Sequence, residues 1–342
     1  MATASRTPRL RRADCTGPGI RRLRHGRGFR YVDADGGRVT EDEVLMRIHE
    51  LVIPPAWREV WICSDPGGHI QATGVDQAGR KQYLYHPRWR ERRDQAKFDD
   101  MVRFARALPA LRERVDAALE SGDLGREHVL ALATRLLDRG FFRIGSEDYA
   151  VRNETYGLAT MKKRHVRLNG GVLLFDYPAK HGKRRLQAVV DPVIADCVAV
   201  LKRRRGGGDE LLAYKRGARW VDVKSADIND FLKEATGLEI SAKDFRTWGA
   251  TVLAAVGLAV SGQASATKTG RKRAITRAVK EVAHYLGNTP AVARASYIDP
   301  RVFDRFREGR AIDSALVAAA GDAAEGTAIQ GPVEEAVLDL LD

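Results

Sequence analysis

The chain has 342 residues, 44% of them hydrophobic, and its 58 Lys and Arg against 45 Asp and Glu leave a net charge of +13. This length suits two domains, and the charge favours a nucleic acid over an anionic membrane surface as the binding partner. No apolar run reaches the roughly 20 residues that span a bilayer, and three scattered cysteines argue against a disulfide framework or a zinc site, so we expect a cytoplasmic protein.

The N-terminal part of the chain predicts a basic arm followed by a small β-rich domain. Residues 1–19 are rich in arginine and are expected to form a flexible arm. Residues 20–93 contain short β-prone runs that are separated by turn sequences rich in Asp and Gly. These runs are Phe29–Val32, Val60–Ser64, Ile70–Val75 and Gln82–Tyr85, with a short helix expected at Glu41–His49.

From about Gln95 the hydrophobic period becomes helical, which predicts a larger, mainly helical domain over residues 94–310. Phe98 to Leu108 form one stripe, and Pro109 is expected to begin a second helix because proline is tolerated at that position. A hairpin, His165–Leu168 with Val172–Tyr177, is expected around Asn169-Gly170-Gly171. The other expected elements are a strand at Arg185–Val190 and helices at Val129–Leu137, Asp191–Arg204, Ser225–Thr236, Ala242–Val260 and Arg271–Gly287.

The chain is therefore predicted to be an α+β protein with two domains. Residues 311–342 are rich in Ala and Gly, and we expect most of this tail to be mobile apart from a short amphipathic piece at Val333–Leu341.

Several residues in the larger domain suit the cleavage of a phosphodiester without a metal ion. Such chemistry needs a nucleophile, donors for the charge on a five-coordinate phosphorus, and an acid for the departing oxygen. Arg143 and Arg246 offer a planar fork that grips two phosphate oxygens, and a partly desolvated Lys180 suits the acid. On the helical face of Arg246, Gly249 leaves room for a close neighbour. Read singly, these residues indicate only a basic, two-domain, DNA-binding protein.

Together the segments resemble the type IB DNA topoisomerases, in particular the small viral and bacterial form, from about residue 20 to residue 310. The matching segments keep the same order along the chain. They are Gly26-Arg-Gly-Phe-Arg-Tyr-Val, Val52-Ile-Pro-Pro-Ala-Trp57, Gly79-Arg-Lys-Gln-Tyr-Leu-Tyr85, Arg143-Ile-Gly, Asn153-Glu-Thr-Tyr-Gly-Leu158, Lys243-Asp-Phe-Arg-Thr-Trp248 and Ser296-Tyr297-Ile298.

This resemblance implies that Tyr297 is the nucleophile, which forms a 3′-phosphotyrosyl bond and releases a 5′ hydroxyl. It implies that Arg143 and Arg246 hold the non-bridging oxygens of the scissile phosphate. Lys180 is the implied general acid, with Lys183 as the rival for that role. It also implies relaxation of supercoiled duplex DNA without ATP, metal or another cofactor.

One position departs from the family pattern, because Asn288 stands where many members carry a histidine. An Asn amide can donate a hydrogen bond to a phosphate oxygen, but it cannot ionise. His284 lies one helical turn earlier and is expected to be a structural or surface residue.

The resemblance also implies a monomer that closes around double-stranded DNA, with no obligate protein partner. Arg80, Gln82, Tyr83 and Tyr85 would face the DNA, although both tyrosines would also suit the core of the sheet. Lys268, Arg271, Lys272 and Arg273 would bind phosphates, or would form a solvated loop.

Two other functions stay open at this point. A tyrosine recombinase uses the same nucleophile, but its first domain is usually helical and not β-rich. A DNA clamp that has lost its chemistry would bind DNA and leave the linking number unchanged. The presence of Tyr297, Lys180 and both arginines argues against such a clamp.

Overall fold

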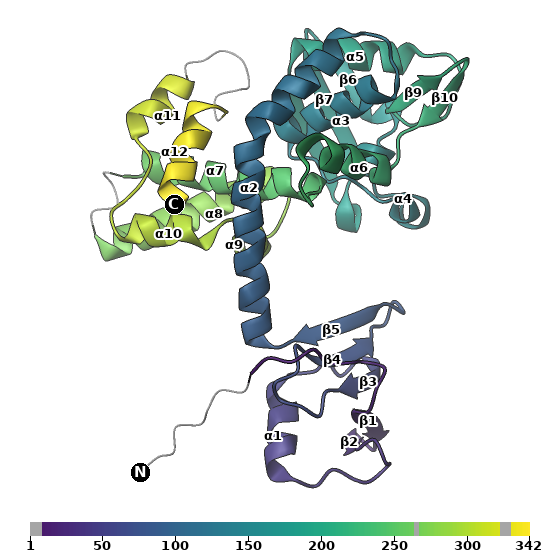
Figure 1. Cartoon of the computed structure of the whole chain (residues 1–342), viewed down its shortest axis with the longest axis vertical. Coiled ribbons are helices and arrows are strands. Elements are labelled where there is room, and N and C mark those ends of the chain that lie inside the picture. Colours follow the sequence, from purple (N-terminus) through teal and green to yellow (C-terminus); the bar gives the residue numbers. More distant parts are fainter. Residues whose placement is uncertain (1–8, 263–266, 322–329) are drawn as a thin grey trace. The chain divides into compact units, whose positions relative to one another are not determined.

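The computed structural model describes residues 9–262, 267–321 and 330–342, and the chain divides into two compact units, Met1–Lys97 and Phe98–Asp342 (Figure 1). We call them the N-terminal and C-terminal units. Strands dominate the first and helices the second, so the predicted α+β class is confirmed. In the described ranges, no helix is long and apolar enough to cross a membrane.

The N-terminal unit is a five-stranded antiparallel sheet in the order β2-β1-β3-β4-β5, with one helix. Its core consists of Ile20, Val39, Ile48, Val60, Ile62 and Ala72. The predicted strands and helix are confirmed, with small changes at their ends. The elements are β1 (Ile20–His25), β2 (Gly28–Val32), α1 (Asp42–Glu50), β3 (Arg58–Ile62), β4 (Ile70–Val75) and β5 (Lys81–Tyr85).

Strand β1 was missed because its inward-facing position 22 is an arginine. The Arg22 guanidinium is buried and donates hydrogen bonds to the carbonyls of Ile53 (3.2 Å), Pro54 (3.0 Å) and Trp57 (2.8 Å). Arg22 therefore holds the Ile-Pro-Pro-Ala-Trp segment against the sheet.

The expected flexible arm covers residues 1–19. Residues 1–8 lie outside the described residues. Arg11, however, donates from its backbone N to the carbonyl of Gly67 (2.9 Å) and accepts from the backbone N of His69 (2.8 Å). The prediction is wrong for this stretch, because backbone pairing, which composition does not reveal, fixes it to the loop before β4.

Helix α2 (Pro87–Glu120) is one continuous helix with Pro109 inside it, so the predicted start of a second helix at this proline is wrong. A proline inside a helix removes one backbone hydrogen bond. Leu108 and Leu111, on either side of Pro109, are buried, as are Val115 and Leu119 further along. Burial of that apolar face outweighs the lost bond.

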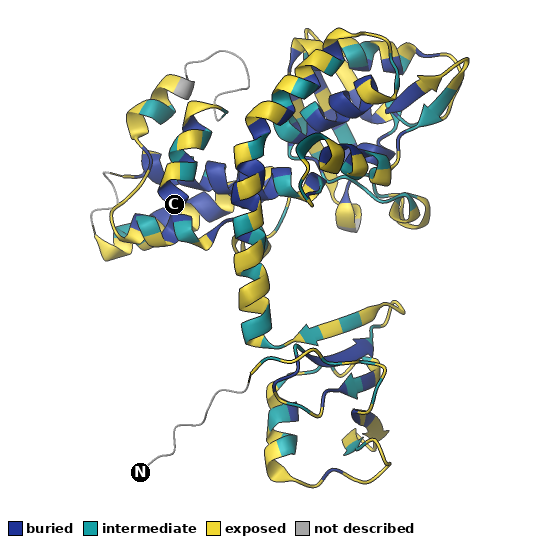
Figure 2. Cartoon of the chain, viewed as in Figure 1, coloured by how far each residue is buried: buried dark blue, intermediate teal, exposed yellow. Residues whose placement is uncertain are grey.

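The rest of the C-terminal unit consists of helices around two small antiparallel sheets. Helices α3 and α7 are largely buried (Figure 2). The predicted hairpin, third strand and main helices are confirmed. The helices are α3 (Arg126–Gly140), α4 (Glu147–Asn153), α5 (Pro192–Arg203), α6 (Ser225–Thr236), α7 (Ala242–Val260), α8 (Lys268–Leu286), α9 (Pro290–Ser296) and α10 (Pro300–Arg307). The strands are β6 (Val166–Asn169), β7 (Val172–Pro178), β8 (Arg184–Val190), β9 (Ala213–Arg216) and β10 (Arg219–Asp222).

The amphipathic piece expected in the tail is confirmed as helix α12 (Pro332–Leu341), but the expectation that the rest is mobile is wrong at helix α11 (Ser314–Gly321). The apolar face of α12 is buried in the main core through Val333, Val337, Leu340 and Leu341. Glu334 on the same helix accepts hydrogen bonds from Trp248 Nε1 (2.8 Å) and from Arg112 (2.6 Å). Residues 322–329 lie outside the described residues.

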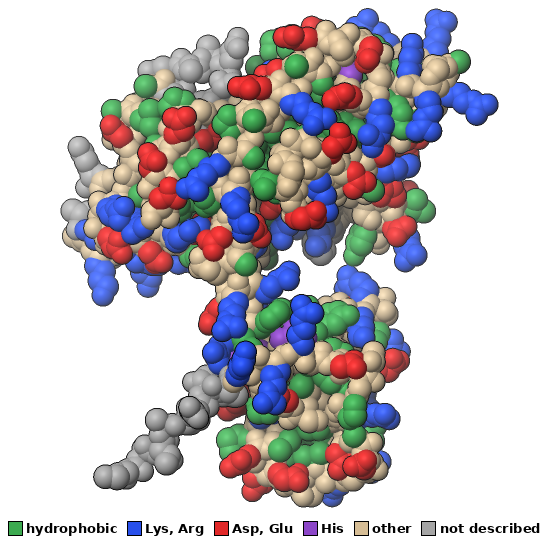
Figure 3. All heavy atoms as spheres, viewed as in Figure 1, with side chains coloured by type: hydrophobic (Ala, Val, Ile, Leu, Met, Phe, Trp, Pro, Cys, Tyr) green, Lys and Arg blue, Asp and Glu red, His purple; other side chains and the backbone are tan. Residues whose placement is uncertain are grey.

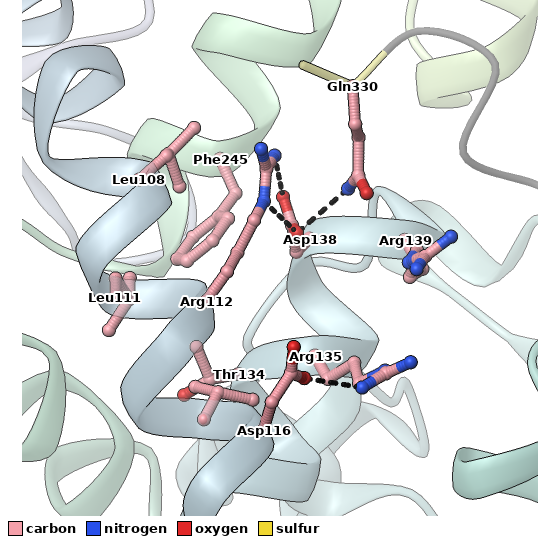
Figure 4. Close-up of a pocket in the computed structure, with 11 residues that line it drawn as sticks. Leu108, Leu111, Arg112, Asp116, Thr134, Arg135, Asp138, Arg139, Phe245 and Gln330 are labelled. Carbon is pink, nitrogen blue, oxygen red and sulfur yellow. Dashed lines mark hydrogen bonds and ion pairs between the residues drawn. The ribbon is translucent and has the colours of Figure 1, made fainter.

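A small cavity of about 110 Å³ lies between α2 and α3, below this C-terminal segment (Figure 4). Its charged groups bind one another. Asp138 accepts from Arg112 (2.8 Å) and from Gln330 (2.8 Å), and Asp116 pairs with Arg135 (2.5 Å). These contacts make the cavity part of the framework that ties α2, α3 and the C-terminal segment together.

Candidate active site

Arg143 is positioned by two segments that pack backbone against backbone. Leu158 N donates to the carbonyl of Arg143 (2.8 Å), and Ala159 N donates to that of Ile144 (2.7 Å). A Cβ atom on Gly157 would lie 2.3 Å from the backbone N of Gly145, so the approach requires glycine. The Arg-Ile-Gly and Tyr-Gly-Leu segments therefore form one rigid layer, and Arg143 extends from it.

Arg246 comes from the first turns of α7, where its side chain is 3% exposed. It donates to the carbonyl of Phe141 and, at 3.0 Å, to that of Leu286. The predicted room beside Gly249 is confirmed, because a Cβ there would lie 2.3 Å from the Phe141 ring. Burial, with the nearby charge of Arg143, lowers the pKa of Arg246 to about 10, so its guanidinium stays positive at neutral pH.

Tyr297 is the residue that ends α9, and it lies beside these cations. The Cζ atom of Arg246 is 5.3 Å from the centroid of its ring, and Nζ of Lys243 is 5.8 Å from it. Burial by itself raises the pKa of the Tyr297 phenol. The positive charge of Arg246, reinforced by Lys243 and Arg143, outweighs that effect and lowers the pKa below its ordinary value. The lowered pKa makes Tyr297 a better oxygen nucleophile near neutral pH.

Asn288 joins the same cluster through Arg143, which donates to its side-chain oxygen and also to the carbonyl of Gly287 (3.3 Å). In the described part of the chain, the buried Asn288 Nδ2 has no hydrogen-bond partner, and neither does the buried Arg246 Nε. An unpaired buried donor costs about 1–3 kcal/mol, so two of them beside guanidinium groups favour an anionic oxygen as their ligand.

Lys180 and Lys183 lie on the connection between β7 and β8, where a short 3₁₀ turn, Lys180–Gly182, is closed by the bond from Ala179 N to the Lys183 carbonyl (2.8 Å). Both lysines are exposed. Within the described residues, neither has a hydrogen bond to the cluster around Tyr297, so the choice between them stays a prediction. His284 is exposed on α8, as the sequence predicted.

Two residues near the cluster were not assigned by sequence reasoning. Lys243 lies one helical turn before Arg246 in the same motif, and that spacing could have identified it. Arg185 on β8 donates to the carbonyls of His284 (3.1 Å) and Tyr285 at the end of α8. In the register of β7 and β8, Arg185 lies opposite the buried Tyr177. Correct alignment of these two strands could have indicated that Arg185 faces inward.

In the N-terminal unit, Tyr83 and Tyr85 lie side by side on the surface of the edge strand β5. They are 42% and 40% exposed, their ring centroids are 6.1 Å apart, and Lys81 Nζ lies 5.8 Å from the Tyr83 centroid. The alternative that they pack into the sheet core is therefore wrong. Arg80 and Gln82 both donate to Asp76, each at 2.9 Å.

Basic side chains gather on both units. In the N-terminal unit they cover the start of α2, which carries Arg88, Arg90, Arg92 and Arg93 (Figure 3). In the C-terminal unit, Lys268, Arg271 and Lys272 line a hollow of about 560 Å³ together with Arg294 and Arg307. Arg273 is exposed on the same helix, α8, so the reading of these four residues as a loop is wrong.

Comparisons with known proteins find matches in both units. Residues 86–310 match the family described as eukaryotic DNA topoisomerase I, catalytic core, and residues 28–76 match the bacterial DNA topoisomerase IB N-terminal domain. A DNA topoisomerase 1B of Acanthamoeba polyphaga mimivirus is 30% identical over 287 residues, which cover 82% of this chain and 85% of the relative. DNA topoisomerase 1B of Vaccinia virus (strain Western Reserve) and DNA topoisomerase I of Monkeypox virus are each 20% identical over 241 residues, which cover 70% of this chain and 74% of the relative.

Proposed function

Since the chain belongs to the type IB DNA topoisomerases, we propose that it relaxes supercoiled duplex DNA by cutting and resealing one strand through Tyr297. The observation that supports this most strongly is the cluster itself. A tyrosine with a lowered pKa lies beside Arg246, and the buried amide of Asn288 has a free donor.

The proposed reaction exchanges one phosphate ester for another. Tyr297 loses its proton to solvent and its oxygen attacks the phosphorus, the bond to the 5′ oxygen breaks, and a 3′-phosphotyrosyl ester forms. The departing 5′ oxygen takes a proton from Lys180, with Lys183 as the alternative donor. Resealing reverses these steps after the free duplex end has rotated.

The groups around Tyr297 suit the transition state of this reaction. Negative charge builds on the non-bridging oxygens of a five-coordinate phosphorus, and fixed donors stabilise that charge without reorganising. Arg143 and Arg246 supply the positive charge, and Asn288 supplies a neutral hydrogen bond. Because the ester exchange retains the bond energy and the arginines neutralise the charge, we propose that neither ATP nor a metal is required.

We also propose that the protein binds duplex DNA as a monomer, using β5 and the basic residues of α8, and that it works in the cytoplasm on the nucleoid. The exposed pair Tyr83 and Tyr85 beside Lys81 supports the first contact. The cations around the α8 hollow support the second, and their binding should weaken steeply as salt rises.

Relaxation of a supercoiled plasmid in EDTA without ATP tests the proposal. The parent protein and a Tyr149→Phe control, altered at an exposed tyrosine of α4, should relax the plasmid, and Tyr297→Phe should bind it without relaxing it. If the parent binds but does not relax DNA, the chain is a clamp or a recombinase-like enzyme. If Tyr297→Phe relaxes the plasmid as fast as the parent, the nucleophile is another residue.

A further inference from the structure

The C-terminal end of α8 collects three guanidinium groups from three different elements. The last four carbonyls of a helix have no partner within it. Here the carbonyls of His284 and Tyr285 accept from Arg185, the carbonyl of Leu286 accepts from Arg246, and that of Gly287 accepts from Arg143. The negative end of the helix dipole thus holds three positive groups close together.

Arg185 differs from the other two arginines because each of its three nitrogens donates to a protein atom. Its two terminal nitrogens bind the His284 and Tyr285 carbonyls, and its Nε donates to Gln187 (3.4 Å). By contrast, Arg246 keeps an unpaired Nε among the described residues. Each nitrogen of the Arg185 guanidinium is therefore bound to the protein through one N–H group, which fixes the plane of the group.

Arg185 also connects two parts of the site along the chain. It lies on β8 three residues after the Lys180–Gly182 turn, opposite Tyr177 on β7, and is therefore at the base of the loop that carries Lys180. Its guanidinium group binds the last turn of α8, which leads into Asn288. A planar guanidinium can hold two successive carbonyls, which a single ammonium group cannot do in one fixed geometry.

Resting on the function proposed above, we propose that Arg185 is a positioning residue, which fixes the end of α8 against β8 so that Asn288 and Arg143 converge on the scissile phosphate. In this role it acts through these groups. Displacing a catalytic group by about 1 Å is enough to lower a rate roughly 100-fold.

The test is single-turnover cleavage of a short duplex at saturating enzyme, designed so that the strand beyond the cut dissociates and leaves the covalent adduct. Arg185→Ala should lower the cleavage rate roughly 10- to 100-fold, with DNA affinity changed far less. The cleavage rate of Arg185→Lys should lie between that of the parent and that of Arg185→Ala. Arg184→Ala is the matched control. Arg184 precedes Arg185 on the same strand, its side chain is 72% exposed, and its one ion pair among the described residues is with Asp176 (2.7 Å). The Arg184→Ala variant should keep the parent rate.

A double-mutant cycle with Asn288→Ala separates positioning from general stability. If Arg185 acts through Asn288, the double variant should lose less than the product of the two single losses. A rate for Arg185→Ala within twofold of Arg184→Ala, or losses that simply multiply, would overturn the inference. If Arg185→Ala does not fold, the same comparisons with Arg185→Lys decide the question. A parent protein that forms no adduct would instead refute the proposed function.

Discussion

Replacing Glu334 by alanine should destabilise the C-terminal unit, because this carboxylate links three helices. It accepts from Arg112 on α2 at 2.6 and 3.0 Å and from Trp248 on α7 at 2.8 Å. Without it, Asp138 is the one acidic partner that Arg112 keeps in the described part of the chain, and the indole N–H of Trp248, a residue that is 2% exposed, loses its acceptor.

The expected size of the effect follows from these contacts. Hydrogen bonds to charged groups contribute about 1.5–3 kcal/mol each. The side chains of Arg112 and Glu334 are 23% and 13% exposed, so solvent screening reduces their share. We expect a total loss of about 2–3 kcal/mol in the free energy of unfolding, which corresponds to a fall in Tm of roughly 5–10 °C for a unit of this size.

Thermal unfolding followed by circular dichroism measures this, with Glu335→Ala as the control. Glu335 is the next residue in the same helical turn and is exposed, so its variant should unfold close to the parent Tm. The reasoning is refuted if the Glu334 and Glu335 variants unfold within about 1 °C of each other.

Three further predictions concern the site and the DNA contacts. The cleavage rate should rise with pH until Tyr297 is ionised. Lys243→Gln should move the midpoint of this pH dependence to higher pH, because it removes a positive charge that lowers the Tyr297 pKa. An unchanged midpoint in the pH profile of the cleavage rate would contradict this. Gly157→Ala should lower the relaxation rate at least tenfold, because its Cβ would meet backbone atoms that cannot move aside, and parent-like relaxation would show that the layer holding Arg143 is not required. In binding titrations at several salt concentrations, Lys272→Gln should reduce the slope of log K against log salt by about 0.9, whereas Tyr83→Ala should weaken binding with the slope unchanged.

The main elements of the fold were predictable from hydrophobic period and turn residues. Helices α6 and α7 begin and end at the predicted residues, and the hairpin turns at two glycines, Gly170 and Gly171, that both have positive φ. These are the places where local preference and tertiary burial agree.

The errors in the fold arose where tertiary contacts overrode local signals. Pro109 predicts a helix start, but the buried leucines on both sides keep α2 continuous. The composition of the tail predicts mobility at α11, although Leu316 and Val317 of that helix pack against the main core. Strands β9 and β10 were missed because a run of charged residues around Gly217 hides their short pattern.

The candidate site also contains residues that the sequence predicted and others that it could not predict. Arg143, Arg246, Asn288 and Tyr297, named from the family resemblance, lie together in the structure. The role of Arg185 could not be read from the sequence, because it depends on which carbonyls end α8. The assignment of Lys180 over Lys183 as the acid stays a prediction, because both lysines are exposed on one connection.

The most direct test of the central claim is to trap the covalent adduct and to identify both of its ends. A duplex whose cut strand is labelled on the 5′ side of the break should transfer that label to the protein, and the modified peptide should contain Tyr297. Attachment through the 5′ phosphate, or through a residue other than Tyr297, would contradict the proposed mechanism.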